Sequence, residues 1–253
     1  MGITIFLWSV VLFTGLLFGS FLFTTAIRLE SGKSLLTPSH CDHCFKKVGV
    51  IGLIPIIGYL FYKGRCRHCG KEVSKLYPLT ELVNALFVLL IFYKTGVSSI
   101  FIQQFVLWEV LFLIALLDFR THLIFPQPVV VGFLFQITWL TLVDPILLRD
   151  ALIGLFLGAG IFHFISYFYQ LIRNRQGLGE GDATLLGLFG LFWGWQVLMP
   201  VIFYGAFTGI IGGGLLLLVK RRKLDSEIPF APWLILGGFL VWYFPALPFL
   251  NLF

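Results

Sequence analysis

Two aspartates stand at the ends of long apolar runs, where a charged side chain is costly unless it has a function. Asp118 closes the run that begins near Ser99, and Asp182 precedes an uncharged run that reaches Val219. Ionisable residues at the edge of a membrane span are candidate functional residues. Two carboxylates that share a proton can serve as general base and general acid on a water molecule. The structural alternatives are a helix cap for Asp182 and an ion pair with Arg120 for Asp118.

Four cysteines form two Cys-x-x-Cys pairs in one polar segment. The pairs Cys41–Cys44 and Cys66–Cys69 are separated by 21 residues. Each pair offers two thiolates at the spacing that tetrahedral zinc needs, and the separation is close to that of a ribbon-like structural site. Because four protein ligands leave no open coordination position, a catalytic zinc is not expected. The sequence predicts a structural zinc site, with reduced thiols that bind no metal as the alternative.

The composition predicts that membrane helices position these groups. The chain of 253 residues is 58% hydrophobic and only 12% charged, whereas ordinary soluble domains contain roughly 25% charged residues. A spanning helix needs about 20 apolar residues. We therefore predict an all-α polytopic integral membrane protein with about eight transmembrane helices, placed near residues 1–27, 79–93, 99–117, 121–143, 151–172, 183–219 (two helices) and 228–253. The break between the two helices of 183–219 is expected near Gly194 or Pro200.

The basic residues predict the orientation. All but two of the 18 Lys and Arg residues fall in loops that follow odd-numbered spans, so these loops are expected to be cytoplasmic and both termini outside. Asp118, Asp182 and the cysteine segment would then share the cytoplasmic face, where disulfides are disfavoured. Nucleic acid is not expected as a partner. The predicted parts are the first span (1–27), a cytoplasmic zinc loop (28–77) and a membrane helical domain (78–253).

The pair of aspartates favours an intramembrane aspartyl protease. A proton- or ion-coupled transporter is the alternative, because intramembrane acids also mark ion paths. Gly179 and Gly181 precede Asp182 and are expected to let the backbone approach a substrate closely. Glu81 and Glu109 also lie in predicted spans, where each could be structural. The sequence contains no His-Glu-x-x-His motif of the kind that zinc metalloproteases use.

Several blocks together resemble the type IV prepilin peptidases. Gly179-Glu180-Gly181-Asp182 matches the Gly-x-Gly-Asp motif of membrane aspartyl proteases. The segment from Asp118 to Pro126 resembles the first-aspartate segment of the family. Further blocks occur in the family's order at Gly19–Leu22, at the cysteine pairs with Gly64–Gly70, at Tyr77–Leu82 and at Glu227–Pro232. The resemblance therefore reaches from residue 19 to residue 232.

The resemblance implies a bifunctional enzyme of the bacterial cytoplasmic membrane. It would cleave the short basic leader of type IV prepilins or pseudopilins after a glycine, on the cytoplasmic side. It would then methylate the new N-terminal amine with S-adenosylmethionine. The implied site residues are the catalytic pair Asp118 and Asp182, the substrate-binding residues Gly179, Glu180 and Gly181, the methylation-associated Glu81, and the zinc ligands Cys41, Cys44, Cys66 and Cys69.

Three residues depart from the family's usual pattern. Phe23 stands where Asn is common, Gln127 follows Pro126 where Asp or Asn is usual, and Thr184 replaces a common Lys. Since the two aspartates are unchanged, peptidase activity is still expected. The departure at Phe23 bears on methylation.

Overall fold

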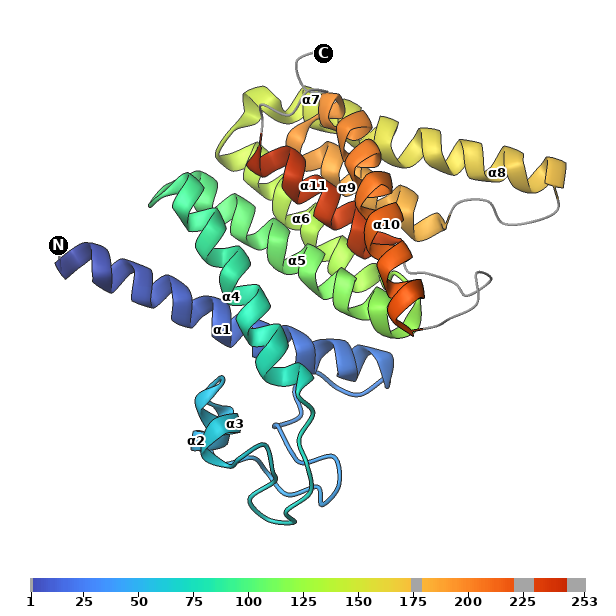
Figure 1. Cartoon of the computed structure of the whole chain (residues 1–253). Coiled ribbons are helices and arrows are strands. Elements are labelled where there is room, and N and C mark those ends of the chain that lie inside the picture. The colour runs from blue at the N-terminus through green and yellow to red at the C-terminus, as the bar shows by residue number, and fades with distance from the viewer. Residues whose placement is uncertain (1, 174–178, 221–229, 245–253) are drawn as a thin grey trace. The chain divides into compact units, whose positions relative to one another are not determined.

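The computed structural model describes residues 2–173, 179–220 and 230–244 (Figure 1). Within these residues the chain is helical, and the only β-type pairing consists of two isolated bridges in the cysteine segment. The chain divides into two compact units, unit 1 (Met1–Leu113) and unit 2 (Ile114–Phe253). Each unit is described by itself below.

Unit 1 contains the helices that surround the cysteine segment. They are α1 (Gly2–Glu30), α2 (Val50–Leu53), α3 (Ile57–Phe61), α4 (Leu76–Thr95) and the first part of α5 (Ser99–Thr121). Helix α1 contains no charged residue before Arg28, as a membrane span requires. Helix α4 ends at Gly96, whose positive φ of 61° is the conformation that helix ends commonly need.

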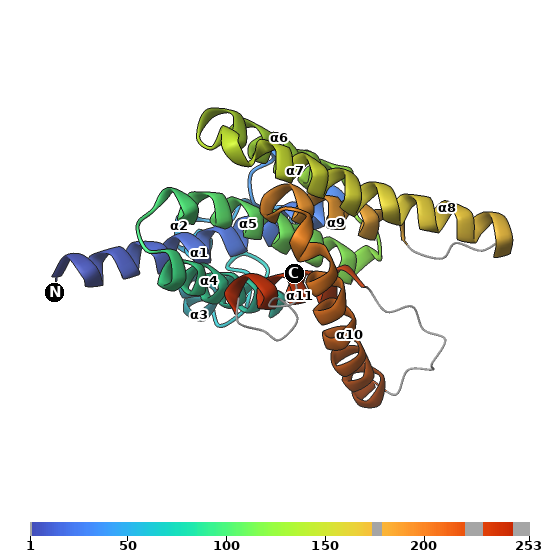
Figure 2. The same ribbon diagram turned by 90° about the horizontal axis from the view of Figure 1, so that it is seen from above.

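Unit 2 contains the rest of α5 and the helices that follow it. They are α6 (Pro126–Leu142), η1 (Pro145–Leu147), α7 (Leu148–Leu155), the π-helical turn η2 (Phe156–Ile161), α8 (Phe162–Arg173), α9 (Glu180–Trp193), η3 (Trp195–Val197), α10 (Leu198–Lys220) and α11 (Ala231–Tyr243). Segments α7, η2 and α8 follow one another without a break (Figure 2). Helix α9 ends at Gly194, which has a φ of 84°. This position confirms the predicted break in the long uncharged run.

The helix lengths support a membrane protein. Among the described residues, five helical segments are long and apolar enough to cross a membrane, namely Gly2–Glu30, Leu76–Thr95, Ser99–Thr121, Pro145–Ile172 and Trp195–Gly214. Three shorter apolar helices accompany them, Pro126–Leu142, Gly181–Trp193 and Ala231–Tyr243. The all-helical fold is confirmed for the described part of the chain, and the count of eight spans stays a prediction.

Helices α1 and α4 pack closely in unit 1 because glycines face the contact. A Cβ on Gly15 would lie 2.7 Å from Cα of Ala85, and one on Gly19 would lie 2.7 Å from Cα of Glu81. Glycines spaced four apart let the backbones of membrane helices approach each other in this way. The side chain of Asn84 joins the contact, since its Nδ2 donates to the carbonyl oxygen of Gly15 (3.0 Å).

Helix α9 is the central element of unit 2. It contacts α6, α7, η2, α8, α10 and α11, and most of its side chains between Ala183 and Phe192 are buried. Helix α7 crosses it with almost no side chains between the two backbones, because Gly154 and Gly190 meet at the crossing. A central helix held on all sides fixes the position of the residues at its N-terminus, which include Asp182.

Candidate active site and metal centre

The last turn of α5 carries Asp118, and hydrogen bonds at the helix end fix its position. The N–H of His122 donates to the carbonyl oxygen of Asp118 (2.9 Å), and the hydroxyl of Thr121 donates to that of Leu117 (2.9 Å). His122 has a φ of 57°, the left-handed conformation in which helices commonly end. Helix α5 therefore continues three residues beyond Asp118, and the aspartate is buried, with 5% of its surface exposed.

Asp182 lies in the first turn of α9. The N-cap residue is Gly179, so the alternative in which Asp182 itself caps the helix is wrong. Asp182 is half-buried, and its N–H donates to the carbonyl oxygen of Gly179 (3.0 Å). A carboxylate in this turn is stabilised by the free N–H groups and the positive end of the helix dipole.

The two aspartates lie close enough to interact electrostatically, although 64 residues separate them in the sequence. The Asp118 carboxylate accepts a hydrogen bond from the backbone N–H of Ala231, the first residue of α11, and His122 lies within electrostatic range. Its Oδ2 atom is buried and has no hydrogen-bond partner among the residues described. The C-terminal end of α5 and the N-terminal ends of α9 and α11 therefore lie near one another, with the two carboxylates within electrostatic range.

The two glycines before Asp182 permit this arrangement. A Cβ on Gly181 would lie 2.7 Å from Cβ of Ile124, and one on Gly179 would lie 3.0 Å from Oδ2 of Asp182. Gly181 therefore lets α9 approach the segment that follows α5, and Gly179 leaves space beside the carboxylate. Their predicted contact with substrate stays a prediction, and the side chain of Glu180 lies outside what the structure describes.

The four cysteine sulfurs form one cluster in the segment between α1 and α4. All four Sγ atoms lie within 4.8 Å of one another, with Cys41 and Cys69 at 3.8 Å and Cys44 and Cys66 at 3.9 Å. Sulfurs placed about 2.3 Å from a tetrahedral zinc ion would be about 3.8 Å apart. The donor set and its spacing therefore fit a tetrahedral metal ion.

Each Cys-x-x-Cys pair is folded by the same two backbone hydrogen bonds. One is donated by the first cysteine and one is accepted by it. The four bonds measure 2.8–3.0 Å and join Cys41 to Lys46, Phe45 to Cys41, Cys66 to Lys71 and Gly70 to Cys66. The similar turns present the four thiols to a common centre.

Backbone donors prepare Cys66 for metal binding. The N–H groups of Cys69 and His68 hydrogen-bond to its sulfur and lower the pKa of the thiol to about 6. The His68 bond measures 3.4 Å. The thiolate is the form that binds a metal, so the local fold favours the reactive state.

Glu81 occupies a polar contact inside unit 1. It is 4% exposed, and its carboxylate accepts hydrogen bonds from the backbone N–H of Ile56 (2.7 Å) and from the side chain of Ser20. Nearby, Phe23 is also buried, and its ring packs edge-on against Tyr77 with centroids 4.7 Å apart. An aromatic contact between α1 and α4 therefore occupies the position where the family commonly has Asn.

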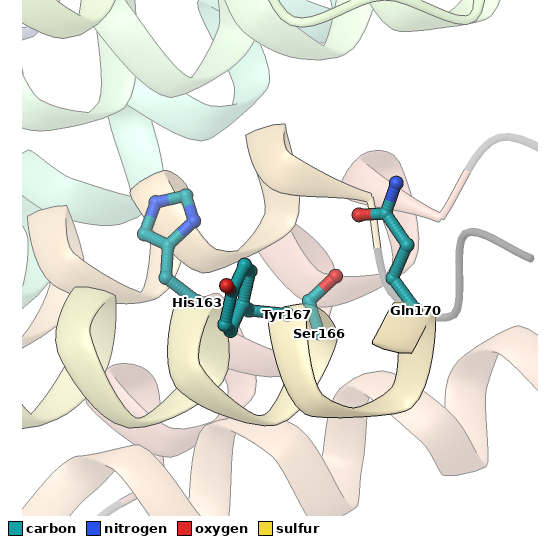
Figure 3. A pocket seen from close by; sticks show the side chains of 4 residues that line it. All are labelled: His163, Ser166, Tyr167 and Gln170. Atoms are coloured by element: carbon teal, nitrogen blue, oxygen red, sulfur yellow. The ribbon is translucent and has the colours of Figure 1, made fainter. Parts of the chain in front are cut away.

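A further hollow of about 240 Å³ lies along α8 (Figure 3). It is lined by His163, Ser166, Tyr167 and Gln170, whose spacing of three and four residues places them on one face of the helix. None of the predicted site residues is among them. The aspartate pair, not this hollow, is the candidate active site.

A buried and a half-buried carboxylate at the ends of apolar helices form the kind of site that a membrane aspartyl protease would need. Two family models match the chain: the Bacterial Peptidase A24 N-terminal domain over residues 13–95 and the Type IV leader peptidase family over residues 105–214. The chain belongs to the type IV leader peptidase family. The first match covers the cysteine segment and Glu81, and the second covers both aspartates.

Relatives with one shared name support this assignment. A "Prepilin leader peptidase/N-methyltransferase" of Bacillus subtilis (strain 168) is 29% identical over 93% of this chain and 94% of its own length. Proteins with the same name from Pseudomonas putida and Dickeya chrysanthemi are 29% and 28% identical, over 81% and 79% of this chain and 71% of each relative. No solved structure matches the chain.

Three residues of the site were not identified from sequence. His122 and Ile124 lie in the block that follows Asp118, and Ala231 lies in the block Glu227–Pro232, of which the structure describes the part from Phe230 on. These blocks were recognised by resemblance, but no role was assigned to the three residues. A backbone donor such as the Ala231 N–H leaves no signal in residue type.

Proposed function

We propose that this protein is a prepilin leader peptidase and N-methyltransferase. It hydrolyses the peptide bond after the last glycine of the leader of a type IV prepilin or pseudopilin, at the cytoplasmic face of the membrane. The observation that carries the proposal is the proximity of Asp118 and Asp182, within electrostatic range of each other near three helix ends. Membership of the family favours this hydrolase over a transporter.

Unequal surroundings assign different roles to the two aspartates. Asp118 accepts the Ala231 N–H at the start of α11 and lies near His122. A hydrogen bond donated to a carboxylate favours its ionised form. Asp182 instead faces the like negative charge of Asp118 among its described surroundings. In the proposed mechanism Asp118 acts as the general base and Asp182 as the general acid.

The reaction follows from these roles. Oδ2 of Asp118 removes a proton from a water molecule as the water oxygen bonds to the carbonyl carbon of the leader's terminal glycine. Asp182 donates its proton to the carbonyl oxygen of this glycine. The addition of water then gives a tetrahedral intermediate. When the C–N bond breaks, the proton taken by Asp118 passes to the leaving amine, and a hydroxyl of the intermediate returns a proton to Asp182 as the carbonyl re-forms. The products are a free leader and a pilin with a new N-terminal amine.

The four cysteines would hold a structural zinc ion. Zinc would join the turns at Cys41–Cys44 and Cys66–Cys69 and stabilise the loop through its four thiolate bonds. The sulfur spacing of 3.8–3.9 Å supports this role. The zinc takes no part in peptide hydrolysis.

The methylation half comprises the zinc loop and the helices that flank it. S-adenosylmethionine would supply the methyl group for the new N-terminal amine. Glu81 would contribute by positioning the loop, since its carboxylate already accepts two hydrogen bonds. Phe23 fills an apolar contact and offers no hydrogen-bonding group to a polar cofactor, so it supports packing rather than methyl transfer.

The proposed topology has eight membrane helices with both termini outside. The three shorter apolar helices and the five longer apolar segments would together make up the eight membrane helices. The basic loops would lie on the cytoplasmic side. This orientation places the aspartates and the cysteine loop where a basic leader would emerge from the bilayer. The apolar helix of the prepilin would remain in the membrane.

Incubation of the purified protein with a prepilin and S-adenosylmethionine tests the proposal. Mass spectrometry of the pilin should detect cleavage after glycine and the addition of one methyl group. Asp118→Asn and Asp182→Asn should each abolish cleavage, whereas a variant at an exposed site such as Gly160→Ala should retain it. Cleavage that persists in both aspartate variants would contradict the mechanism.

A further inference from the structure

An apolar hairpin interrupts the otherwise polar cysteine segment. Residues 48–62 contain no charged side chain and fold into α2 and α3, which contact each other where Gly58 meets Gly52. An uncharged run of this length is too short to cross a bilayer and is typical of re-entrant or interfacial segments. We call residues 50–61 the apolar hairpin.

Large apolar side chains of the hairpin are exposed to the surroundings. The exposed fractions are 81% for Val50, 48% for Leu53, 58% for Ile57, 66% for Leu60 and 64% for Phe61. Soluble surfaces rarely carry contiguous apolar patches unless these contact a partner or a membrane. The hairpin therefore needs an apolar neighbour.

The bond between Ile56 and Glu81 fixes the hairpin at the level of the membrane helices. The Ile56 N–H donates to Oε2 of Glu81 at 2.7 Å, and Glu81 lies about 7.5 Å along α4 from Leu76. The 20 residues of α4 measure about 30 Å, the thickness of the hydrocarbon core. The bond therefore holds Ile56 beside the N-terminal part of α4, close to the level at which this helix would enter the bilayer.

A strained turn centred on Ile56 sets the position of the hairpin beside Glu81. Ile56 has a φ of 60° and a ψ of −52°, and the N–H of Ile57 donates back to the carbonyl oxygen of Pro55. This γ-turn is rare and strained, especially for a β-branched residue. Such strain persists only where the surroundings hold it, and here the turn directs the Ile56 N–H to the buried Glu81 carboxylate.

Basic residues border the hairpin on both sides. Lys46 and Lys47 precede it, and Lys63 and Arg65 follow it, all with exposed side chains. The guanidinium of Arg67 lies 4.0 Å from the position of a Cβ on Gly49. Exposed apolar groups beside cations are the pattern of segments that bind an anionic lipid surface.

We propose that the apolar hairpin is a membrane anchor that inserts into the anionic headgroup boundary and that Glu81 holds it there. The cysteine segment is then fastened to the bilayer surface at its middle as well as at its ends. The inference depends on the membrane setting of α1 and α4 and not on the chemistry of the two aspartates.

Photo-crosslinking of the full chain in nanodiscs tests the anchor. p-Benzoylphenylalanine at Phe61 should form lipid adducts, detected by mass spectrometry, in phosphatidylethanolamine discs that contain phosphatidylglycerol. The matched control is the same group at Leu36, which lies in the same segment and is 93% exposed. Equal lipid yields at both positions, or adducts at Phe61 mainly with a second copy of the chain or with the substrate, would overturn the proposal.

Two further comparisons test the charge and the role of Glu81. Replacing phosphatidylglycerol by phosphatidylcholine should lower the adduct yield at Phe61 by about fivefold, and an unchanged yield would refute the anionic preference. Glu81→Ala should also lower the yield, whereas Glu81→Gln should preserve it because the amide oxygen can still accept from Ile56. Equal yields in these two variants would refute the positioning role. Cleavage of prepilin, measured in parallel, reports separately on the proposed function.

Discussion

The backbone N–H of Ala231, at the first residue of α11, donates a hydrogen bond to the carboxylate of Asp118 in the last turn of α5. No such donor is found for the carboxylate of Asp182 among the described contacts. In the proposed mechanism, the hydrogen bond from Ala231 stabilises Asp118 in its role as general base.

Removal of the Ala231 N–H should move the acidic limb of the pH profile. Replacing Ala231 by its α-hydroxy analogue changes the amide to an ester and deletes only this donor. Two titratable groups that interact with Asp118, His122 and Asp182, both remain. Since the ionised base loses a hydrogen bond, the acidic limb of kcat/KM should shift to higher pH. Alanine introduced by the same route is the control, and a lower rate without a shifted limb would contradict the assignment.

Gly181→Ala should impair cleavage through a steric clash with Ile124. The new Cβ would lie 2.7 Å from Cβ of Ile124 and 2.9 Å from Cγ1 and Cδ1. Because α9 must then move, kcat/KM should fall by about tenfold or more. Ile124→Ala removes two of the three contacts and should restore part of the loss. Gly160→Ala is the control and should retain full activity, because nothing lies within 4 Å of the new Cβ. If Ile124→Ala does not restore activity to the Gly181→Ala variant, the steric explanation is wrong.

Glu109 should prove structural rather than catalytic. Its two carboxylate oxygens accept hydrogen bonds from Nδ2 of Asn84 at 3.1 and 3.2 Å within unit 1. Glu109→Gln can keep a hydrogen bond, so prepilin cleavage should stay within about twofold of the unmodified protein. Asn84→Ala should lower the free energy of unfolding by about 1 kcal/mol, measured by denaturation in detergent. Loss of cleavage in well-folded Glu109→Gln would indicate a chemical role.

Cys66 should supply the first thiolate of the metal centre. Backbone N–H groups of Cys69 and His68 lower the pKa of Cys66 to about 6. In metal-free protein, the thiolate absorbance should therefore fall as the pH is lowered through about 6, and Cys66→Ser should remove this step. Elemental analysis should find one zinc ion per chain in the unmodified protein and a loss of zinc in Cys66→Ser. Retention of zinc by the variant would contradict the four-cysteine site.

Features that depend on local sequence could be predicted. The uncharged runs predicted the helices, and the positive-φ Gly194 ends α9 within the expected interval. The two Cys-x-x-Cys pairs predicted the cluster of four sulfurs, because each such turn brings its own two sulfurs close together. Helix α6 begins at Pro126, inside the predicted span 121–143, because proline is favoured in the first turn of a helix.

Features that depend on contacts between distant segments could not be predicted. The Ala231 donor belongs to the backbone, and the contact of Gly181 with Ile124 joins segments that no periodic pattern relates. The hairpin was read as part of a polar loop because the surrounding basic residues dominated its composition. Its depth follows only from the hydrogen bond between Ile56 and Glu81.

The short central helix of unit 2 has a consequence for the lipid around it. Helix α9 has 14 residues and is therefore about 21 Å long, about 9 Å less than the hydrocarbon core. In the proposed topology this hydrophobic mismatch draws the bilayer thinner beside α9 or leaves its N-terminus below the membrane surface. In both cases Asp182 lies at a deformed lipid–water boundary. The rate of hydrolysis should therefore depend on the thickness of the host membrane.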